Sequence, residues 1–303
     1  MLLAARVICP HTDADGLAAG ALALAARGED ASAAALLQRG ENPFQEGILP
    51  SERPVAILDW GVRPFPGPAL FVDHHALEED PGPEQIVISG YGADPEVSSS
   101  ILTGRIVQDP ARWVAAVGAV GDLGDRAWLL PDLGRITKTH VRKLVPLINA
   151  PRRLPQGPIR EALAILLENS DARTALGDPR IRLLEDAKEE WRSGLQAALR
   201  TAPEVLNMVA VIEFSSPYQI HPLVAQTWAR RLAGNVVIAA NANYIPGKVN
   251  FAVRGSTGDL RALLRSALPD EGGEFARGHA RATGGSISPE SFRRLIKALR
   301  EQT

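Results

Sequence analysis

The chain has 303 residues, enough for two domains that each bury a core of their own. Its net charge of -2, its pI of about 6.3 and its aromatic content of 5% argue against a broad basic surface for long nucleic acid and against an extended stacking platform for single strands. The single cysteine, Cys9, rules out an internal disulfide framework and fits a reducing compartment. The Ala-rich run 17–26 is too short to span a bilayer and follows no signal-peptide layout, so we predict a cytoplasmic protein without a membrane partner.

The first 120 residues alternate short apolar runs with helical stretches. Residues 3–9 are expected to form a strand, and residues 16–27 a helix that ends at Gly28. Three further strands are predicted at residues 55–59, 69–72 and 85–89. This alternation predicts an α/β fold with a mostly parallel sheet, helices on both of its faces, and a ligand site at the carboxyl ends of the strands.

From residue 95 to about residue 201 the pattern is helical, and residues 181–200 form a long amphipathic stretch before Pro203. Strands return at residues 205–214, 236–240 and 249–253, and helices are expected at residues 222–232, 259–268 and 289–300. We therefore predict a first domain over residues 1–180, a helical linker over residues 181–203, and a smaller α/β domain over residues 204–303.

Acidic and histidine side chains collect in four short segments of the first domain. The segments are His11-Thr12-Asp13-Ala14-Asp15-Gly16, Asp59, Asp73-His74-His75, and Gly118-Ala119-Val120-Gly121-Asp122. Each acidic group ends an apolar run, and such ends meet at one edge of a parallel sheet. Carboxylates gathered there would raise each other's pKa unless divalent cations supplied the missing positive charge.

Taken singly, each of these aspartates is as well explained by a helix cap or a turn. Three of the six histidines nevertheless lie in the same segments, and this coincidence favours a metal centre. Mixed carboxylate and imidazole ligands favour manganese, with iron, cobalt and zinc as competitors. The number of ligands suffices for a two-metal centre that acts on a phosphoryl group.

The four segments, in this order, resemble the motifs of the DHH phosphoesterases, a family named after the triplet that stands here as Asp73-His74-His75. Residues 250–256 and 278–285 are similar to the DHH-associated domain, although the family's run of three glycines before the histidine reads Ala276-Arg277-Gly278. The resemblance covers nearly the whole chain. It makes residues 1–180 the DHH catalytic domain and residues 204–303 the DHH-associated, substrate-binding domain.

The resemblance implies two Mn²⁺ ions, with Mg²⁺ or Co²⁺ as substitutes. The implied ligands are His11, Asp13 and Asp59 for one ion, and Asp15, Asp59, His74 and Asp122 for the other, with Asp59 bridging. In some members the first ligand stands at the position of Cys9, and Asp125 is the alternative to Asp122. Asp73 is expected to orient a histidine and His75 to face the substrate phosphate. The implied substrate-binding residues of the second domain are Arg254, Gly278, His279, Gly284 and Gly285.

The predicted function is a manganese-dependent phosphodiesterase that hydrolyses short oligonucleotides and dinucleotides to mononucleotides, through a hydroxide bridging the two metals. Cyclic dinucleotides such as cyclic di-AMP are a further predicted substrate. The second domain is expected to close over the cleft, with a turn at residues 284–286 offering backbone N–H groups to the phosphate.

Three alternatives stay open: a 5′-to-3′ single-strand exonuclease of RecJ type, a pyrophosphatase, and a non-catalytic nucleotide-binding module. RecJ-type enzymes usually carry additional oligonucleotide-binding modules, for which 303 residues leave no room, so short substrates are preferred. Substrate length, RNA or DNA, cleavage polarity and the presence of a homodimer are not determined by the sequence.

Overall fold

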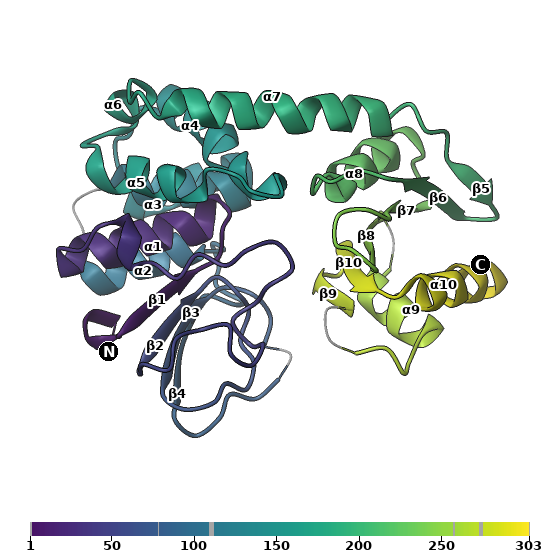
Figure 1. Ribbon diagram of the computed structural model, residues 1–303, viewed down its shortest axis with the longest axis horizontal. Helices are drawn as coiled ribbons and strands as arrows, with labels where there is room; N and C mark the ends of the chain where they lie inside the picture. Colours follow the sequence, from purple (N-terminus) through teal and green to yellow (C-terminus); the bar gives the residue numbers. More distant parts are fainter. Residues whose placement is uncertain (1, 78, 109–111, 257, 273–274, 303) are drawn as a thin grey trace. The chain divides into compact units, whose positions relative to one another are not determined.

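The computed structural model describes residues 2–77, 79–108, 112–256, 258–272 and 275–302 (Figure 1). The chain divides into two compact units. Unit 1 comprises Met1–Arg152 and Gln156–Lys188, and unit 2 comprises Arg153–Pro155 and Glu189–Thr303. The division falls inside helix α7 (Ile181–Ala198). Among the described residues, no helix combines the length and the apolar character needed to cross a membrane.

Unit 1 is built on a four-stranded parallel sheet whose strands lie in chain order. The strands are β1 (Val7–Pro10), β2 (Val55–Leu58), β3 (Ala69–Asp73) and β4 (Gln85–Ser89). Pro10 pairs with Leu58 and Leu58 with Val72, so the first three strands reach the same level at their carboxyl ends. The predicted α/β class and parallel sheet are confirmed. The first strand is shorter than expected, because Leu2–Ala4 forms a 3-10 helix.

The helices of unit 1 lie together on one face of this sheet (Figure 1). They are α1 (Ala14–Arg27), α2 (Ser99–Val107), α3 (Arg112–Leu123), α4 (Lys138–Ile148), α5 (Ile159–Glu168) and α6 (Ala172–Leu176), with 3-10 helices η2 (Ala31–Ala33), η3 (Gly124–Leu129), η4 (Pro131–Leu133) and η5 (Pro151–Arg153). Helix α1 ends at Gly28 in the left-handed conformation, as predicted. Buried Leu58 and Val72 join the helices in one core.

The opposite face of the sheet carries loops rather than the helices that we predicted there. Ile57 and Phe71 point to this face and pack in a second core with Leu37 and Phe65. These partners come from the segments that connect β1 to β2 and β2 to β3. A layer of loops therefore covers this face.

Unit 2 contains a six-stranded mixed sheet in the order β5-β6-β7-β8-β10-β9. The strands are β5 (Glu204–Leu206), β6 (Val209–Phe214), β7 (Val236–Asn241), β8 (Val249–Arg254), β9 (Phe275–His279) and β10 (Ala282–Ile287). Helices α9 (Leu260–Ala267) and α10 (Pro289–Gln302) belong to the core on one face, while α8 (His221–Arg231) and the end of α7 belong to the core on the other.

Two features of unit 2 differ from the sequence prediction. The stretch 205–214 is a hairpin of β5 and β6, and it turns at Asn207, which has a positive φ of 53°. Strands β9 and β10 were not predicted, because their glycines give no apolar alternation. Residues 284–286 lie inside β10, which pairs on both sides, so the predicted phosphate-binding turn at this position is wrong.

Candidate metal centre

The strand register brings the predicted residues of unit 1 to one edge of the sheet. Beyond the last strand pairs, the N–H of His11 donates to the carbonyl of Leu58 at 2.9 Å, and the N–H of Asp59 donates to the carbonyl of Val72 at 3.0 Å. His11, Asp59 and Asp73 therefore follow each other across three neighbouring strand ends. Asp59 has a φ of 69°, a left-handed conformation that costs a non-glycine residue about 1 kcal/mol. Such strain is typical of residues that are held for function.

One group of ligand atoms forms around the start of α1. Nδ1 of His11 lies 2.9 Å from Oδ2 of Asp13 and 3.8 Å from Oδ2 of Asp59. The three residues offer one ligand atom each within 4.8 Å of one another. Asp13 also caps α1 by accepting from the N–H of Gly16 at 3.1 Å, and its Oδ2 pairs with Arg152 at 2.9 Å. Burial would raise the pKa of Asp13, but His11 and Arg152 hold it well below its ordinary value.

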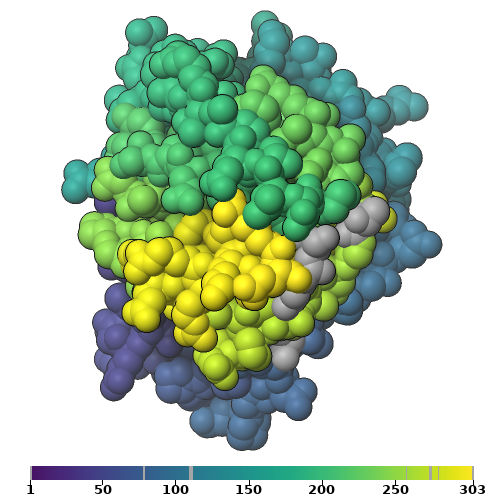
Figure 2. All heavy atoms as spheres, turned by 90° about the vertical axis from the view of Figure 1, so that its right-hand side faces the viewer, coloured from purple at the N-terminus to yellow at the C-terminus, as the bar shows by residue number. Residues whose placement is uncertain are grey.

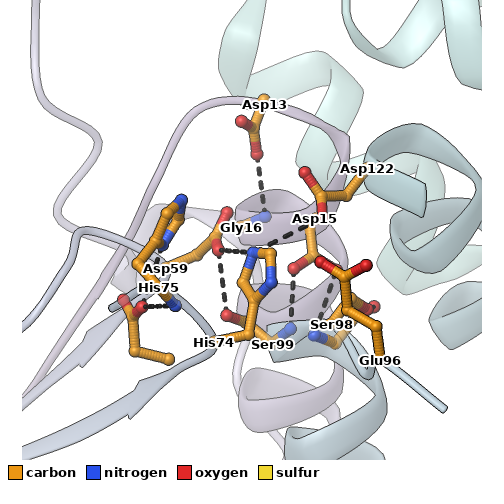
Figure 3. Close-up of polar contacts among 12 residues, drawn as sticks. Asp13, Asp15, Gly16, Asp59, His74, His75, Glu96, Ser98, Ser99 and Asp122 are labelled. Atoms are coloured by element: carbon orange, nitrogen blue, oxygen red, sulfur yellow. Dashed lines mark hydrogen bonds and ion pairs between the residues drawn. The ribbon is translucent and has the colours of Figure 1, made fainter. Parts of the chain in front are cut away.

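A second group forms around His74 (Figure 3). Its Nε2 lies 3.5 Å from Oδ1 of Asp59 and 3.5 Å from Oδ2 of Asp122. His74 is buried, and within the described part of the chain neither of its ring nitrogens has a hydrogen bond. A buried imidazole nitrogen that has no hydrogen bond and lies 3.5 Å from each of two carboxylate oxygens has the surroundings of a metal ligand. Asp59 belongs to both groups, which fits a bridging ligand.

The acidic groups around this centre repel one another. Burial raises the pKa of Asp59 well above its ordinary value, and the charges of Asp15 and Asp13 raise it further. Burial also raises the pKa of Asp122 to about 6, with Asp15 and Asp13 adding to the rise and His74 opposing it, although a third of the side chain of Asp122 is exposed. A divalent cation would remove this cost, so the donor set fits such an ion.

Asp15, the other predicted ligand, binds the start of helix α2. Its Oδ2 accepts from the N–H of Ser99 at 2.7 Å and its Oδ1 from the N–H of Ser100 at 3.1 Å. Each carboxylate oxygen has a second lone pair that remains for a cation. Asp15 is 3% exposed and lies close enough to Asp59 and Asp122 to raise the pKa of both.

The two glycines before Asp122 allow α3 to approach this cluster. A Cβ on Gly118 would lie 2.7 Å from Oδ1 of Asp15 and 2.6 Å from Cβ of Ser100. A Cβ on Gly121 would lie 2.7 Å from Cβ of Ala14. Asp122 thus reaches the centre from a helix and not from a strand end, because glycines on one side of α3 let it pack tightly against α1 and α2.

Asp73 holds His75, which together with Asp59 and His74 also offers ligand atoms within 4.8 Å of one another. Oδ1 of Asp73 accepts from the backbone N–H of His75 at 2.7 Å and lies 2.9 Å from its ring Nδ1, while Oδ2 accepts from the N–H of Gly61 at 2.6 Å. Burial would raise the pKa of Asp73, but these bonds keep it below its ordinary value. Burial acts to lower the pKa of His75, and Asp73 with Asp59 instead raises it to about 9. Cations bound nearby would oppose this rise.

The two alternative ligand positions, Asp125 and Cys9, lie in surroundings that differ from those of the two ligand groups. Asp125 is 77% exposed, pairs with Arg142 at 2.7 Å, and accepts from the indole N–H of Trp128 at 3.3 Å. This geometry favours Asp122 over Asp125 as the acidic ligand. Cys9 is fully buried in the core beneath the sheet, and burial raises the pKa of its thiol to about 12, so it does not offer a thiolate to the centre.

The predicted substrate-binding residues of unit 2 lie on three neighbouring strands. Arg254 ends β8, Gly278 and His279 lie in β9, and Gly284 and Gly285 lie in β10. The side chain of His279 lies outside the described residues. The guanidinium of Arg254 donates to the carbonyls of Val253 at 2.9 Å and Thr283 at 3.5 Å. A Cβ on Gly284 would collide with the backbone of Phe251, so this glycine has a structural reason to be present.

The structure adds three polar residues that the sequence analysis did not select. Ser99 donates its hydroxyl to Oδ1 of Asp59 at 2.9 Å, Arg152 pairs with Asp13, and Asn149 accepts from the N–H of Ala14 at 3.0 Å. The run Ser98-Ser99-Ser100 was a visible helix-start signal, but nothing nearby in the sequence connects it with Asp59.

The comparisons with known proteins bear on the fold. No family model and no curated protein matches the chain. Among solved structures, RecJ from Thermus thermophilus in complex with Mn²⁺ shares 18% identity at a TM-score of 0.65, over 98% of this chain and 51% of its own. The pGpG-specific phosphodiesterase PggH from Vibrio cholerae shares 16% identity at a TM-score of 0.55, over 98% of both chains.

A third match is the DHH domain of a protein described as a member of a ribosomal-protein family, with 16% identity, a TM-score of 0.59, and coverage of 99% of this chain and 87% of that one. The chain has the DHH-domain fold. The resemblance found in the sequence is thus confirmed at the level of the fold. This chain spans about half of the length of the Thermus RecJ chain.

Proposed function

We propose that this DHH-fold chain is a metal-dependent phosphodiesterase that hydrolyses short oligonucleotides and dinucleotides to mononucleotides. The observation that supports it most is the buried ring of His74, whose Nε2 faces Asp59 and Asp122 at 3.5 Å each. His11, Asp13 and Asp15 complete a set of imidazole and carboxylate donors, which is suited to Mn²⁺ among the common divalent ions.

Two divalent ions held by this set would supply Lewis acidity and a nucleophilic water at neutral pH. The residues around them would orient and stabilise the substrate. Asp73 fixes the Nδ1 side of the His75 ring, so Nε2 points to the opposite side. From there His75 would donate a proton to a phosphate oxygen or to the leaving oxygen. Arg152, which pairs with Asp13, would offer a guanidinium to the phosphate when Asp13 turns to a metal.

The size of the substrate is inferred from charge and from the neighbours. A net charge of -2 and 5% aromatic residues give little support for tracking a long strand. PggH, whose named substrate is the dinucleotide pGpG, matches this chain over 98% of both lengths. These observations support short linear substrates, and cyclic dinucleotides are the next class to test.

A RecJ-type single-strand exonuclease is the second candidate. It is favoured by the RecJ structures, which cover 98% of this chain at TM-scores of 0.64 and 0.65. The two candidates differ in the length of strand that they degrade and not in the metal centre, so a substrate comparison separates them.

The first experiment mixes the protein and Mn²⁺ with a 5′-phosphorylated dinucleotide, cyclic di-AMP and a long single strand in equal amounts. Rapid release of mononucleotides from the dinucleotide, with slow loss of the long strand, would support the proposal. Rapid and processive loss of the long strand would support the RecJ-type alternative, and no hydrolysis in Mn²⁺, Mg²⁺ or Co²⁺ would reject both.

A pair of variants tests the bridging ligand. Asp59→Asn should abolish Mn²⁺-dependent hydrolysis, because Asp59 is shared by both ligand groups. The matched control is Asp125→Asn, which neutralises an exposed aspartate paired with Arg142. Retained hydrolysis in Asp59→Asn would reject the bridging role.

A further variant tests unit 2. Arg254→Ala should raise KM for substrates with a terminal phosphate, and an unchanged KM would show that Arg254 does not bind substrate.

A further inference from the structure

Helix α2 begins against the acidic side chains of the metal centre. Ser99 and Ser100 are fully buried, and their backbone N–H groups donate to the two oxygens of Asp15 at 2.7 and 3.1 Å. The hydroxyl of Ser99 donates to Oδ1 of Asp59 at 2.9 Å (Figure 3). Ser99 thus touches two carboxylates, one in the first turn of α1 and one after the end of β2, which lie 84 and 40 positions away in the chain.

The first backbone N–H groups of helix α2 are capped by Asp15 and not by Ser98, the residue at the N-cap position. Ser98 occupies the N-cap position, but its side chain makes no capping bond and instead lies 3.0 Å from the hydroxyl of Ser100. Asp15 accepts the first N–H groups in its place, and the positive end of the helix stabilises its charge. Asp15 is therefore fixed with its two oxygens in a defined orientation.

Asp59 has fewer constraints of its own. Its left-handed backbone and its place after a strand end leave the side chain to be oriented by neighbours. Among the described residues, the Ser99 hydroxyl is the hydrogen-bond donor to its carboxylate, and it binds Oδ1, the same oxygen that faces His74 at 3.5 Å. The bond from Ser99 occupies one lone pair and directs the remaining ones towards the ligand groups.

We propose that Ser99 is a positioning residue for the metal centre, which orients the Asp59 carboxylate for metal binding while its backbone N–H, with that of Ser100, orients Asp15. The inference rests on the proposed function, because it assigns these carboxylates to a metal. Partners of metal ligands typically contribute about 10–100-fold to metal affinity. Ser99→Ala keeps the backbone bond to Asp15 and removes only the bond to Asp59.

The test measures Mn²⁺ binding by calorimetry and hydrolysis separately. Ser99→Ala should weaken Mn²⁺ affinity by about 10–100-fold and lower kcat, with KM for the dinucleotide little changed. The matched control is Ser98→Ala, which removes an equally buried hydroxyl that binds Ser100 and no carboxylate. Equal Mn²⁺ affinity in Ser99→Ala and the parent protein would overturn the positioning role and leave the proposed function standing.

Failure of the proposed function and failure of the positioning role of Ser99 give different results. A parent protein that binds Mn²⁺ but hydrolyses none of the substrates would reject the proposed function, while a loss of affinity confined to Ser99→Ala would still support the positioning role. A parent protein that binds no divalent ion would reject both.

A different observation concerns the edge of the sheet in unit 2. Strand β5 is the end strand and pairs only with β6 in the part of the chain that the structure describes. Leu206 and Val209 close a two-residue hairpin, so the N–H and C=O of Val205 point away from β6. Val205, Leu206 and Met208 are 49%, 47% and 50% exposed. An exposed apolar edge of this kind is suited to pair with another strand.

A groove runs beside this edge, between the β5–β6 hairpin and α10, which is yellow in Figure 2. Its volume is about 510 Å³, and its lining combines apolar side chains, among them Leu206 and Ile296, with three cations and two anions: Arg293, Lys297, Arg300, Glu213 and Glu301. On the strand, Glu204 faces the same side as Leu206 and pairs with Arg300 at 2.9 Å. The edge thus presents an acidic residue, Glu204, at one end, and at the other end Leu206 beside a groove whose lining has a small excess of positive charge.

This charge pattern is complementary to itself, and from it we infer that β5 pairs with β5 of a second copy of the chain. In an antiparallel pair centred on Val205, the partner's Glu204 lies opposite Leu206, on the side where Arg293 and Lys297 line the groove. The two copies of Val205 then exchange two backbone hydrogen bonds across a two-fold axis. The inference is independent of the proposed function.

Sedimentation velocity tests this pairing. The parent protein should sediment as a dimer, and Leu206→Glu should be a monomer because it places a carboxylate directly opposite the partner's Glu204. The control is Leu183→Glu, which changes an equally exposed leucine on α7 and should remain dimeric. Val205→Pro, which removes the outward N–H, should also be monomeric. A monomeric parent protein, or a dimer that survives both β5 variants, would overturn the inference.

Discussion

Neutralising Asp122 should stabilise the metal-free protein and weaken its response to metal. In the absence of cations, burial and the nearby charges of Asp15 and Asp13 raise the pKa of Asp122 from 3.8 to about 6. Folding therefore disfavours the ionised form of this carboxylate. Asp122→Asn removes the charge with little change of shape, so above pH 6 the variant should be the more stable protein in a chelating buffer.

The size of this stabilisation follows from the pKa shift of Asp122. A rise of about two pKa units corresponds to ~2.7 kcal/mol of unfolding free energy when the group is fully ionised. Since 34% of the side chain is exposed, solvent screening reduces this value, and we expect about 1–2 kcal/mol. The destabilisation is absent below the unfolded pKa of 3.8 and grows as the pH rises through the folded pKa of about 6.

Urea unfolding at about pH 7.5 and about pH 4.5 with a chelator measures the difference, and adding Mn²⁺ should reverse it. A bound ion at about a hundred times its Kd stabilises the folded state by about 2.7 kcal/mol, and the variant lacks one of the proposed metal ligands. The parent protein should therefore gain more from Mn²⁺ than Asp122→Asn. If the metal-free variant is less stable than the parent at the higher pH, the mutual repulsion that we infer in this centre is refuted.

Two further predictions concern the neighbourhood of the centre. Asp73→Asn replaces the carboxylate that accepts from the ring and the backbone of His75, so kcat for the dinucleotide should fall about 100-fold with little change in KM, and an unchanged kcat would contradict the orienting role. Gly118→Ala places a Cβ 2.6 Å from Cβ of Ser100 and should lower the free energy of unfolding by about 1–3 kcal/mol in urea. Gly104→Ala is its control, because a Cβ there meets nothing nearer than 3.8 Å and should be neutral or slightly stabilising.

The strand-end residues of the centre were predictable because strands of a parallel sheet, buried on both faces, read as continuous apolar runs whose ends are visible in the sequence. Each of the apolar runs before His11, Asp59 and Asp73 is a strand, and the register places their ends side by side. Asp122 was selected for the same apolar run before it, but it reaches the centre from helix α3. Asp122 still lies at the centre, because Gly118 and Gly121 let α3 pack closely against α1 and α2.

Contacts between distant segments could not be predicted in the same way. Ser99 binds Asp59 across 40 positions and Arg152 binds Asp13 across 139. Neither partner choice follows from local spacing, since each depends on how helices pack over the sheet. Strands β9 and β10 were missed for a related reason. Their pairing with β8 is specified by close backbone contact at Gly284, and glycine contributes nothing to an apolar pattern.

The balance of charge in the centre bears on how many ions it needs. When all four are ionised, the carboxylates of Asp13, Asp15, Asp59 and Asp122 face the guanidinium of Arg152, which leaves a local charge of about -3, and the Asp73–His75 pair adds no net charge to it. One divalent ion would still leave the centre negative, and a phosphodiester would be repelled. Two divalent ions would make it positive by about one charge, which attracts the phosphate. The acidic composition of the whole chain is therefore compatible with an anionic substrate, because the attraction arises only where both ions bind.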